Sequence, residues 1–430
     1  MPFPAFEQYD KHMHAIRAAI YQAADPVLAV ERALTCDAGG LVVSGKRYPL
    51  RPDGSIYLVA FGKASCSMAS AAAKKLGARL KAGVASIPTG ASLSLPHVEV
   101  FHGGHPLPDE GSLAAGQAVG RLLEHTSSGD LVLVLISGGG SAMLEWPREE
   151  IELDDLQVLT QLLLRCGAPI QEINIVRKAI SRTKAGGVAR LAAPARVVAL
   201  ILSDVVGDRL TAIASGTTVL RRVTAADARQ VLNRYGILHE IPERVRVALS
   251  IDPPQSKPAR MPGNHLVGSN RLGLAAAAAE AQKLGFKPCI VNTRMHGEAR
   301  VVAVRFARRL ARAEQGTCLL MGGETTVTLR GEGKGGRNQE FALAAGMVLP
   351  EKPHTAIMSL ATDGVDGPTD AAGAVITSRL QEQAARAGVN LSHALADNNS
   401  YHALKTLDGL IHTGPSGTNV NDIVVGLVYA

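Results

Sequence analysis

The stretch Leu131-Val132-Leu133-Val134-Leu135-Ile136, followed directly by Ser137-Gly138-Gly139-Gly140-Ser141, decides the fold class. Six consecutive aliphatic residues are typical of a strand buried on both faces, as in a parallel sheet covered by helices. Three glycines in a row weaken a fold unless something must approach the backbone closely, and phosphate is the commonest such partner. The stretch therefore predicts an α/β domain with an anion-binding loop, for which the alternative is an ordinary pliable turn.

Three further apolar runs have the same character, at residues 56–61, 98–102 and 197–202. They alternate with helical stretches, which indicates one parallel sheet with helices on both faces. In such folds ligands bind beyond the carboxyl ends of the strands. We therefore expect the loops after these strands to meet at one edge of the sheet. Those loops are Gly62-Lys63, Gly103-Gly104-His105-Pro106 and Ser203-Asp204.

A second α/β unit follows a proline-rich segment without periodicity at residues 251–263. Because 430 residues exceed the usual size of a single core, two domains are expected, at 1–256 and 257–430. Helical periodicity spans residues 6–34 of the first domain. The second, smaller domain combines a predicted helix at 271–285 with strands at 265–268, 288–291, 317–321, 355–361 and 423–429.

Composition excludes several classes of protein. The chain has a formal charge of +7 and a pI near 9.2, but its basic residues are dispersed and only 3% of its residues are aromatic, so we expect no nucleic-acid partner. Its five cysteines lack C-x-x-C spacing and are expected to be reduced, mostly buried thiols. Without a signal pattern or an apolar run long enough for a membrane span, the sequence predicts a soluble cytoplasmic protein with no membrane partner.

Basic residues in the first domain are candidates for binding an anion. Lys63 lies where backbone N–H groups and a helix dipole favour one, but Tyr57 and Ala64 break the Walker A pattern, and a solvated lysine is the alternative. One predicted helix carries Asn174, Arg177, Lys178 and Lys184, the first three on one face. A solvated basic face explains that spacing too.

Carboxylates end a strand in each domain, at Asp204 and at Asp363. Such a group can hold Mg²⁺ or accept a proton from a hydroxyl. The alternative is an aspartate that caps a helix or a turn. The histidines, His102 and His105 among them, show no zinc-binding pattern.

Glycines are dense between residues 322 and 340. Residues 322–326 resemble a hairpin turn whose second arm runs through 327–330. Gly331, Gly333 and Gly336 then satisfy G-x-G-x-x-G, but no strand-to-helix context and no acidic residue about twenty positions on support a dinucleotide site. Arg337, at a predicted helix start, is well placed to bind phosphate through two N–H groups.

Taken together, these motifs resemble the glycerate 2-kinase family, whose C-terminal half is called the MOFRL domain and which has also been labelled hydroxypyruvate reductase. The resemblance runs in order along most of the chain. The matching segments are Phe61-Gly62-Lys63-Ala64, Gly104-His105-Pro106-Leu107-Pro108-Asp109, Ser137 to Ala142, Asn174 to Lys178, Leu202 to Val205, Gly335 to Glu340, Ala361 to Gly367 and Thr413 to Asp422.

The resemblance implies ATP-dependent phosphorylation of D-glycerate at its 2-hydroxyl with Mg²⁺, in a cleft between a Rossmann-like α/β/α N-terminal domain and a smaller mixed α/β domain. It makes Lys63 and Arg337 the leading catalytic residues, supported by Asp204 and Asp363. It implies Mg²⁺ ligands among Asp204, Asp363 and Glu324, and contacts of the substrate carboxylate with His105, Arg177 or Lys178. The implied nucleotide-binding residues are Ser137, Gly138, Gly139, Gly140, Ser141, Gly335, Gly336, Asn338, Thr418 and Asn419.

Two other functions stay open at this point. One is an NAD(P)H-dependent hydroxypyruvate reductase, which the glycines at 331–336 and the older family label favour. The other is a non-catalytic protein that binds a nucleotide or a nucleic acid. The sequence leaves the oligomeric state open, a homodimer included.

Overall fold

The computed structural model describes residues 4–149, 151–253 and 260–429. Its contacts divide the chain into two compact units. Residues 26–267 form one, the parallel-sheet unit, and residues 1–25 with 268–430 form the other, the mixed-sheet unit. The predicted boundary between residues 256 and 257 lies outside the described residues. The units differ from the predicted domains at residues 1–25, because helix α1 (Tyr9–Ala24) packs on α11 (Asn270–Lys283).

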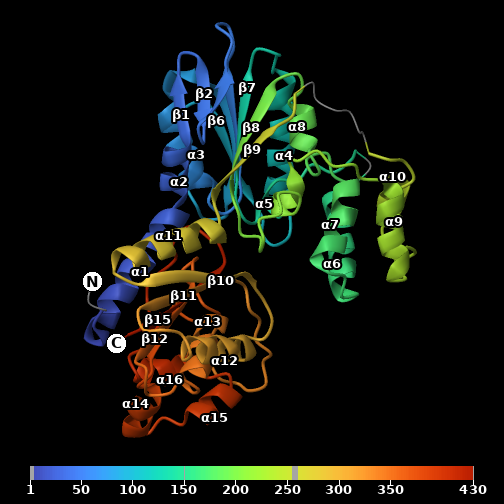
Figure 1. The fold of residues 1–430 in the computed structure, drawn as a ribbon. Coiled ribbons are helices and arrows are strands. Elements are labelled where there is room, and N and C mark those ends of the chain that lie inside the picture. The colour runs from blue at the N-terminus through green and yellow to red at the C-terminus, as the bar shows by residue number, and fades with distance from the viewer. Residues whose placement is uncertain (1–3, 150, 254–259, 430) are drawn as a thin grey trace. The chain divides into compact units, whose positions relative to one another are not determined.

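The parallel-sheet unit has a six-stranded sheet in the order β6-β5-β4-β7-β8-β9 (Figure 1). The strands from β4 to β8 pair in parallel; the aliphatic runs predicted β4, β6, β7 and β8, whereas β5 was not predicted. The strand predicted at 265–268 for the second domain is instead the sixth strand of this sheet. The prediction was wrong because this strand lies far in sequence from the strands with which it forms the sheet. The strands are β4 (Ile56–Phe61), β5 (Leu80–Pro88), β6 (Val98–Gly103), β7 (Leu131–Ile136), β8 (Arg196–Leu202) and β9 (Gly263–Gly268).

Helices bury this sheet. Every residue of β4 and β7 is buried, and alternate residues of the strands form one core cluster with α4 (Glu110–Glu124) and α8 (Gly187–Leu191). Helix α3 (Ser65–Leu76) packs on β4 and β5, and the four-residue α5 (Gly140–Met143) follows β7. Full burial explains why these strands read as unbroken aliphatic runs.

Four helices of the same unit share a separate apolar core beside the sheet (Figure 1). Helix α7 ends at Ala179, so Lys184 does not belong to it, contrary to the prediction. The core includes Leu163, Val176 and Leu232. The helices are α6 (Leu153–Arg165), α7 (Ile170–Ala179), α9 (Ala225–Arg234) and α10 (Glu243–Ala248).

A small antiparallel sheet precedes β4 and was not predicted. Its three strands are β1 (Leu34–Asp37), β2 (Gly40–Val43) and β3 (Lys46–Pro49). The helical periodicity at 6–34 divides into η1 (Phe6–Gln8), α1 and α2 (Pro26–Ala33), with Pro26 opening the second α-helix. Proline suits the first turn of a helix but not its interior, so it separates the two.

The mixed-sheet unit has a six-stranded sheet in the order β10-β11-β15-β12-β13-β14. Only the pair β10–β11 is parallel. Alternate residues of β15 are buried in two different cores. Val424 and Val428 belong to one core, and Ile423, Val425 and Leu427 belong to the other. Its strands are β10 (Lys287–Met295), β11 (Thr317–Gly323), β12 (Thr355–Ala361), β13 (Gly373–Thr377), β14 (Leu410–Ile411) and β15 (Asp422–Val428). Besides α1 and α11 its α-helices are α12 (Ala299–Leu310), α13 (Arg337–Gly346), α14 (Leu380–Ala387), α15 (Leu391–Ala396) and α16 (Ser400–Thr406).

All five cysteines are free thiols, but only Cys318 is buried. The prediction of mostly buried thiols is therefore wrong, since Cys289 is exposed and the other three are partly so. Burial raises the pKa of the Cys318 thiol to about 12. Within the described ranges, no helix is both long enough and apolar enough to span a bilayer.

Replacing Ile20 by Ala should destabilise the mixed-sheet unit, because this α1 side chain is fully buried in the core that holds α1 to α11. We expect the free energy of unfolding to fall by about 3 kcal/mol, measured by denaturant titration. The matched control Ile290→Ala, at a 41% exposed position of β10, should cost about 1 kcal/mol or less. Equal losses would show that α1 does not support this core.

Candidate active site

The loops after β4 and β7 are joined at the carboxyl edge of the parallel sheet. The N–H of Lys63 donates to the carbonyl of Gly138 at 2.8 Å, and the N–H of Ala64 donates to Ser137 Oγ at 3.0 Å. Gly62 has φ +109°, and a Cβ there would overlap Ser137. Only glycine satisfies both conditions, so close packing against the loop that begins at Ser137 requires a glycine before Lys63.

The glycine loop also contacts the loops after β6 and β8. A Cβ on Gly138 would overlap the carboxylate of Asp204. Gly139 has φ +79°, and a Cβ there would lie 2.9 Å from His105 Cδ2 and 3.3 Å from Lys63 Cγ. Four loops therefore converge here, and the structure brings Lys63, His105 and Asp204 to the predicted loop.

Lys63 and His105 differ in their surroundings. The Lys63 side chain is exposed, and we find no hydrogen bond or ion pair of its ammonium group in the part of the chain that the structure describes. Burial lowers the pKa of His105, and the charge of Lys63 lowers it further. Both effects favour the neutral form of His105, whereas the Lys63 side chain is exposed to solvent.

Residues of α7 hold the far end of the glycine loop. Ser141 Oγ lies 2.8 Å from Ser215 Oγ, which in turn donates to Asn174 Oδ1 at 3.0 Å. Arg177 donates to the carbonyl of Ser141 at 2.9 Å. Ser215, which the sequence analysis missed, has φ +58° after Ala214 at φ +45°. Two successive non-glycine residues in this region store of the order of 1–3 kcal/mol each, a feature that clusters at functional sites.

A buried ion network lies behind Arg177. Glu145 accepts from Lys184 Nζ at 2.6 Å and from Ser181 Oγ at 2.6 Å, and lies 3.9 Å from Arg177. Lys184 is completely buried, and desolvation lowers its pKa to about 8 against the opposing charge of Glu145. The sequence analysis did not find Glu145, because the contacts that mark it come from residues 32 to 39 positions later. This network makes Arg177 a support of the loop.

Lys178 contacts the loop after β8. Its Nζ donates to the carbonyl of Thr211 at 2.7 Å. Burial lowers its pKa to about 8, and the charge of Arg221 contributes to the lowering. The predicted face of α7 therefore turns Asn174, Arg177 and Lys178 toward loops of the sheet edge.

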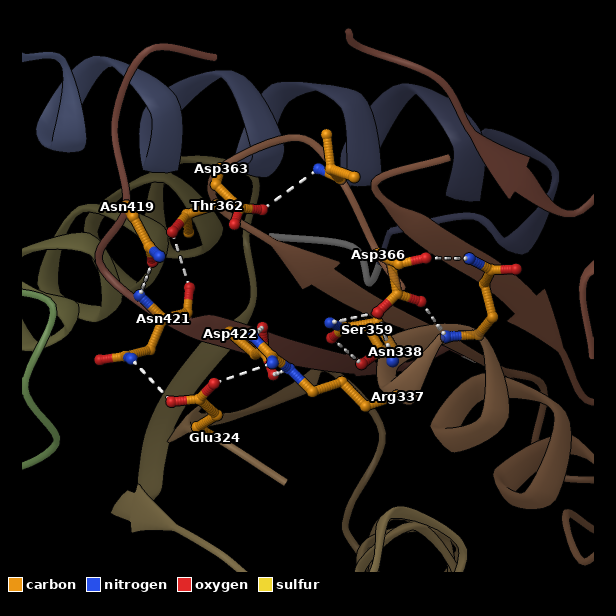
Figure 2. Close-up of polar contacts among 12 residues, drawn as sticks. Glu324, Arg337, Asn338, Ser359, Thr362, Asp363, Asp366, Asn419, Asn421 and Asp422 are labelled. Carbon is orange, nitrogen blue, oxygen red and sulfur yellow. Dashed lines mark hydrogen bonds and ion pairs between the residues drawn. The ribbon is translucent and has the colours of Figure 1, made fainter. Parts of the chain in front are cut away.

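In the mixed-sheet unit, Arg337 begins α13 as predicted and is bound by two carboxylates (Figure 2). Its Nε and Nη2 donate to Asp422 at 2.6 and 3.0 Å, and its Nη1 lies 2.8 Å from Glu324. Asp422, which opens β15, is 1% exposed. Burial raises the pKa of Asp422 to about 7, although its hydrogen bonds to Arg337 favour the charged form.

The amino end of α13 is capped from within the unit. Asp366 accepts the N–H groups of Asn338 at 3.0 Å and Gln339 at 2.9 Å (Figure 2). Gly336 packs on Asp366, where a Cβ would overlap it. Asn338 also accepts from Ser359 Oγ at 2.7 Å. The groups predicted to bind nucleotide at Gly336 and Asn338 thus contact their own unit.

The segment before α13 is not the predicted hairpin arm, since residues 327–336 contain no strand. The N–H of Gly333 donates to the carbonyl of Asp397, and a Cβ on Gly331 or Gly333 would overlap the turn at 397–399. A Cβ on Gly335 would likewise overlap Ser400 Oγ. Close packing on this turn accounts for Gly331 and Gly333 of the G-x-G-x-x-G pattern, and packing on Asp366 accounts for Gly336.

The loop at 413–422 carries Thr418 and Asn419, and the loop after β12 carries Asp363. Asn419 Oδ1 accepts the N–H of Asn421, whose side chain donates to Glu324 at 3.3 Å. Thr418 Oγ1 donates to the carbonyl of Ala24. Asp363 is partly exposed and accepts the N–H of Val365 at 3.1 Å. Figure 2 shows Asp363, Asn419 and Glu324 together with Asn421 and Asp422.

The predicted carboxylates could coordinate Mg²⁺ only together with oxygen atoms from phosphate and water. No group of three or more potential metal ligands occurs among the described residues. Glu324 is paired with Arg337, and Asp204 lies in the other unit. Mg²⁺ in nucleotide enzymes is usually held by one or two carboxylates, with phosphate and water oxygens completing the shell. Asp363 or Asp204 suits that arrangement.

Comparisons with known proteins agree with this architecture. A family model described as a domain of unknown function (DUF4147) matches residues 12–250, more than half of the chain, and the MOFRL family matches residues 317–422. A Pyrococcus horikoshii protein named glycerate 2-kinase is 41% identical over 421 residues, covering 95% of this chain and 94% of its own. The chain belongs to the glycerate kinase family.

Relatives of this family in other organisms are similarly close. The D-glycerate 2-kinase of Thermotoga maritima is 40% identical over 382 residues, which cover 87% of this chain and 90% of that protein. A crystal structure of a P. horikoshii protein has a TM-score of 0.90 at 39% identity, covering 98% of both chains. That of T. maritima glycerate kinase has a TM-score of 0.89 at 36% identity, covering 98% of this chain and 100% of its own. The predicted α/β/α and mixed α/β architecture is confirmed.

Replacing Arg337 by Gln should destabilise the protein more at pH 8 than at pH 5. The pKa of Asp422, about 7 in the folded state, lies above its value of about 3.9 in an unfolded chain. The folded state therefore keeps a proton that the unfolded state releases between about pH 4 and 7, and stability from this group falls as the pH rises. Without Arg337 the buried charge is unpaired, and we expect a loss of about 3–5 kcal/mol at pH 8 by denaturant unfolding.

The double variant Arg337→Gln/Asp422→Asn is the control for that experiment. It removes the titrating group, so its loss of stability should be nearly the same at both pH values. If the Arg337→Gln variant is equally destabilised at pH 5 and pH 8, the raised pKa of Asp422 and its pairing with Arg337 are contradicted.

Proposed function

We propose that the protein is a glycerate 2-kinase, which transfers the terminal phosphoryl group of ATP to the 2-hydroxyl of D-glycerate and yields 2-phosphoglycerate. The observation that carries this proposal is the 41% identity to a glycerate 2-kinase over nearly the full length of both chains. We further propose that the active site lies between the two units, because each contributes a predicted catalytic cation.

Lys63 supplies a movable positive charge in this proposal. Phosphoryl transfer requires of a protein mainly position and electrostatic stabilisation around the transferred group. The exposed side chain of Lys63 lies beside Gly139, where an added Cβ would be 3.3 Å from Lys63 Cγ. The loop would orient the phosphate chain while Lys63 neutralises charge on the terminal phosphoryl group.

Arg337 supplies a fixed positive charge. Asp422 holds two of its nitrogens, so the orientation of the guanidinium is set before substrate binds. Glu324 holds the third nitrogen but is itself 44% exposed, so it is the partner that an anionic substrate can displace. A pre-oriented donor group stabilises a transition state without the cost of reorganisation.

ATP and Mg²⁺ would serve as co-substrate and metal cofactor. The bound metal would neutralise charge on the phosphates, and Asp363 or Asp204 would contribute one or two of its ligands. The same two carboxylates are the candidates to receive the proton of the 2-hydroxyl. His105, packed against Gly139, would form a hydrogen bond with glycerate.

The reductase alternative has no specific observation in its favour. It depended on the glycines of 331–336 and on the older family label. The packing of these glycines on the 397–400 turn and on Asp366 accounts for them without a dinucleotide.

The test is an assay with purified protein, ATP and D-glycerate, with and without Mg²⁺. We expect Mg²⁺-dependent formation of ADP and of 2-phosphoglycerate, identified by phosphorus NMR against authentic 2- and 3-phosphoglycerate. Formation of 3-phosphoglycerate would contradict the regiochemistry. Oxidation of NADH with hydroxypyruvate, without turnover of ATP, would contradict the whole proposal.

The substitution Lys63→Ala should lower kcat by about a hundredfold or more, because a charge next to the transferred group is lost. Steady-state kinetics with saturating ATP and glycerate measure this effect. Lys74→Ala, at an exposed lysine of α3, is the matched control and should retain normal rates. If both variants are equally active, Lys63 has no catalytic role.

A single methyl group at Gly138 should impair turnover in the same assay. In Gly138→Ala the new Cβ would overlap the Asp204 carboxylate and displace either the loop or the aspartate. We expect kcat to fall at least tenfold, as small misplacements cost of this order or more. Gly129→Ala is the control, since its Cβ would lie no closer than 3.2 Å to the flexible side chain of Arg51. Normal activity of Gly138→Ala would refute the role of the loop.

A further inference from the structure

A cavity of about 540 Å³ opens in the parallel-sheet unit, beside the residues discussed above. Residues of α7, of α9 and of the segment 205–223 that follows β8 line it. Its volume lies within the range of small-molecule binding sites. Of the candidate residues of the predicted α7 face, Asn174 and Lys178 line it.

The cavity carries an excess of positive charge. Two acidic residues line it, Glu172 and Asp227, and Glu172 is paired with Arg234. In the part of the chain that the structure describes, no ion pair of the other four basic groups is found. The five basic residues of the lining are Lys178, Arg209, Arg221, Arg222 and Arg234.

The same cavity has an apolar part. Ile170, the first residue of α7, is 59% exposed. Simple phosphate would leave this apolar surface unused, whereas a ligand with a flat organic group and several negative charges would cover both parts. The apolar residues of the lining are Ile170, Ile175, Val205, Val223 and Val231.

The cavity adjoins the glycine loop through side chains. Asn174 lines the cavity and accepts from Ser215, which contacts Ser141 of the loop. Val205, also in the lining, directly follows Asp204, whose carboxylate lies against Gly138. A ligand in the cavity would thus be next to the loop that we propose to orient phosphates.

We infer that this cavity binds the adenine nucleotide, with the base on the apolar residues and the phosphates between Arg221, Arg222, Lys178 and the glycine loop. The inference rests on the proposed function and adds to it which unit holds the nucleotide. It gives Lys178 to the nucleotide phosphates and leaves glycerate to other groups. The chemical class required is an organic polyphosphate with a planar apolar group.

Calorimetric titration of the full-length protein tests this assignment with three probes in the absence of glycerate. ATP should bind more tightly than inorganic tripolyphosphate or adenosine, because only ATP reaches both parts of the cavity. Equal affinity for tripolyphosphate and ATP would overturn the inference, since it would show a site for phosphate alone.

The double variant Arg221→Ala/Arg222→Ala should weaken ATP binding by about tenfold or more, the effect expected for lost hydrogen bonds between charged groups. In steady-state kinetics its KM for ATP should rise by a similar factor, while its KM for glycerate stays within twofold. Both arginines are exposed, so the fold should persist, as a thermal melt would verify. A second variant, Ile170→Asp, places a negative charge in the cavity at the first residue of α7, where an acidic residue favours the helix. It should weaken ATP binding too.

The matched control is Arg308→Ala/Arg312→Ala, which removes the same charge from exposed positions at the end of α12 and beyond it in the other unit. It should change ATP affinity less than twofold. Unchanged ATP affinity in both cavity variants, or an equal loss in the control, would overturn the inference.

The outcomes separate this inference from the proposed function. Turnover of glycerate with an unchanged KM for ATP in the cavity variants would leave the kinase activity standing and refute the nucleotide site. ATP binding that depends on Arg221 and Arg222, in a protein that does not phosphorylate glycerate, would support the site and refute the kinase activity.

Discussion

The close approach of the backbone at the carboxyl edge of the parallel sheet is the constraint on which the candidate site depends. Gly62 and Gly138 each lie where a Cβ would overlap a side chain of a neighbouring loop, Ser137 or Asp204. Because the strands before these loops are parallel neighbours, their ends meet at one edge and leave little room. Glycines at these positions let the peptide groups pack closely against Ser137, Asp204 and His105, beside Lys63.

The two candidate cations are presented in different ways. Lys63 is exposed on a loop, whereas Arg337 is held at the start of α13 by the buried Asp422. A buried carboxylate is costly unless a cation compensates it, so the Asp422–Arg337 pair ties the position of the cation to the stability of its unit. In a kinase this would combine a mobile charge, able to follow the transferred group, with a stationary one.

Buried charged residues support the glycine loop from within the parallel-sheet unit. Arg177 donates to the carbonyl of Ser141, the buried Glu145 pairs with Arg177, and the buried Lys184 pairs with Glu145 in turn. Such a chain of partners fixes the geometry of a loop that has few side chains of its own. It also explains why a basic face on α7, which looks like a solvent-exposed surface in the sequence, is largely turned inward.

The sequence by itself determined the α/β class, four strands of the parallel sheet and the loops that meet at its edge, because continuous aliphatic runs and glycine patterns are local signals. Lys63, Arg337 and the glycine loop could be found for the same reason. Strand β5, whose residues form no continuous aliphatic run, was not predicted. Only the tertiary structure decided the partners of those residues: Asp422 for Arg337, Glu145 for Arg177, Ser215 for Ser141. It also moved the strand at 263–268 into the first sheet, grouped α1 with α11, and explained the glycines at 331–336 by packing. These contacts join residues tens or hundreds of positions apart, and no local pattern of charge or hydrophobicity specifies which distant group will fill the space beside a given side chain.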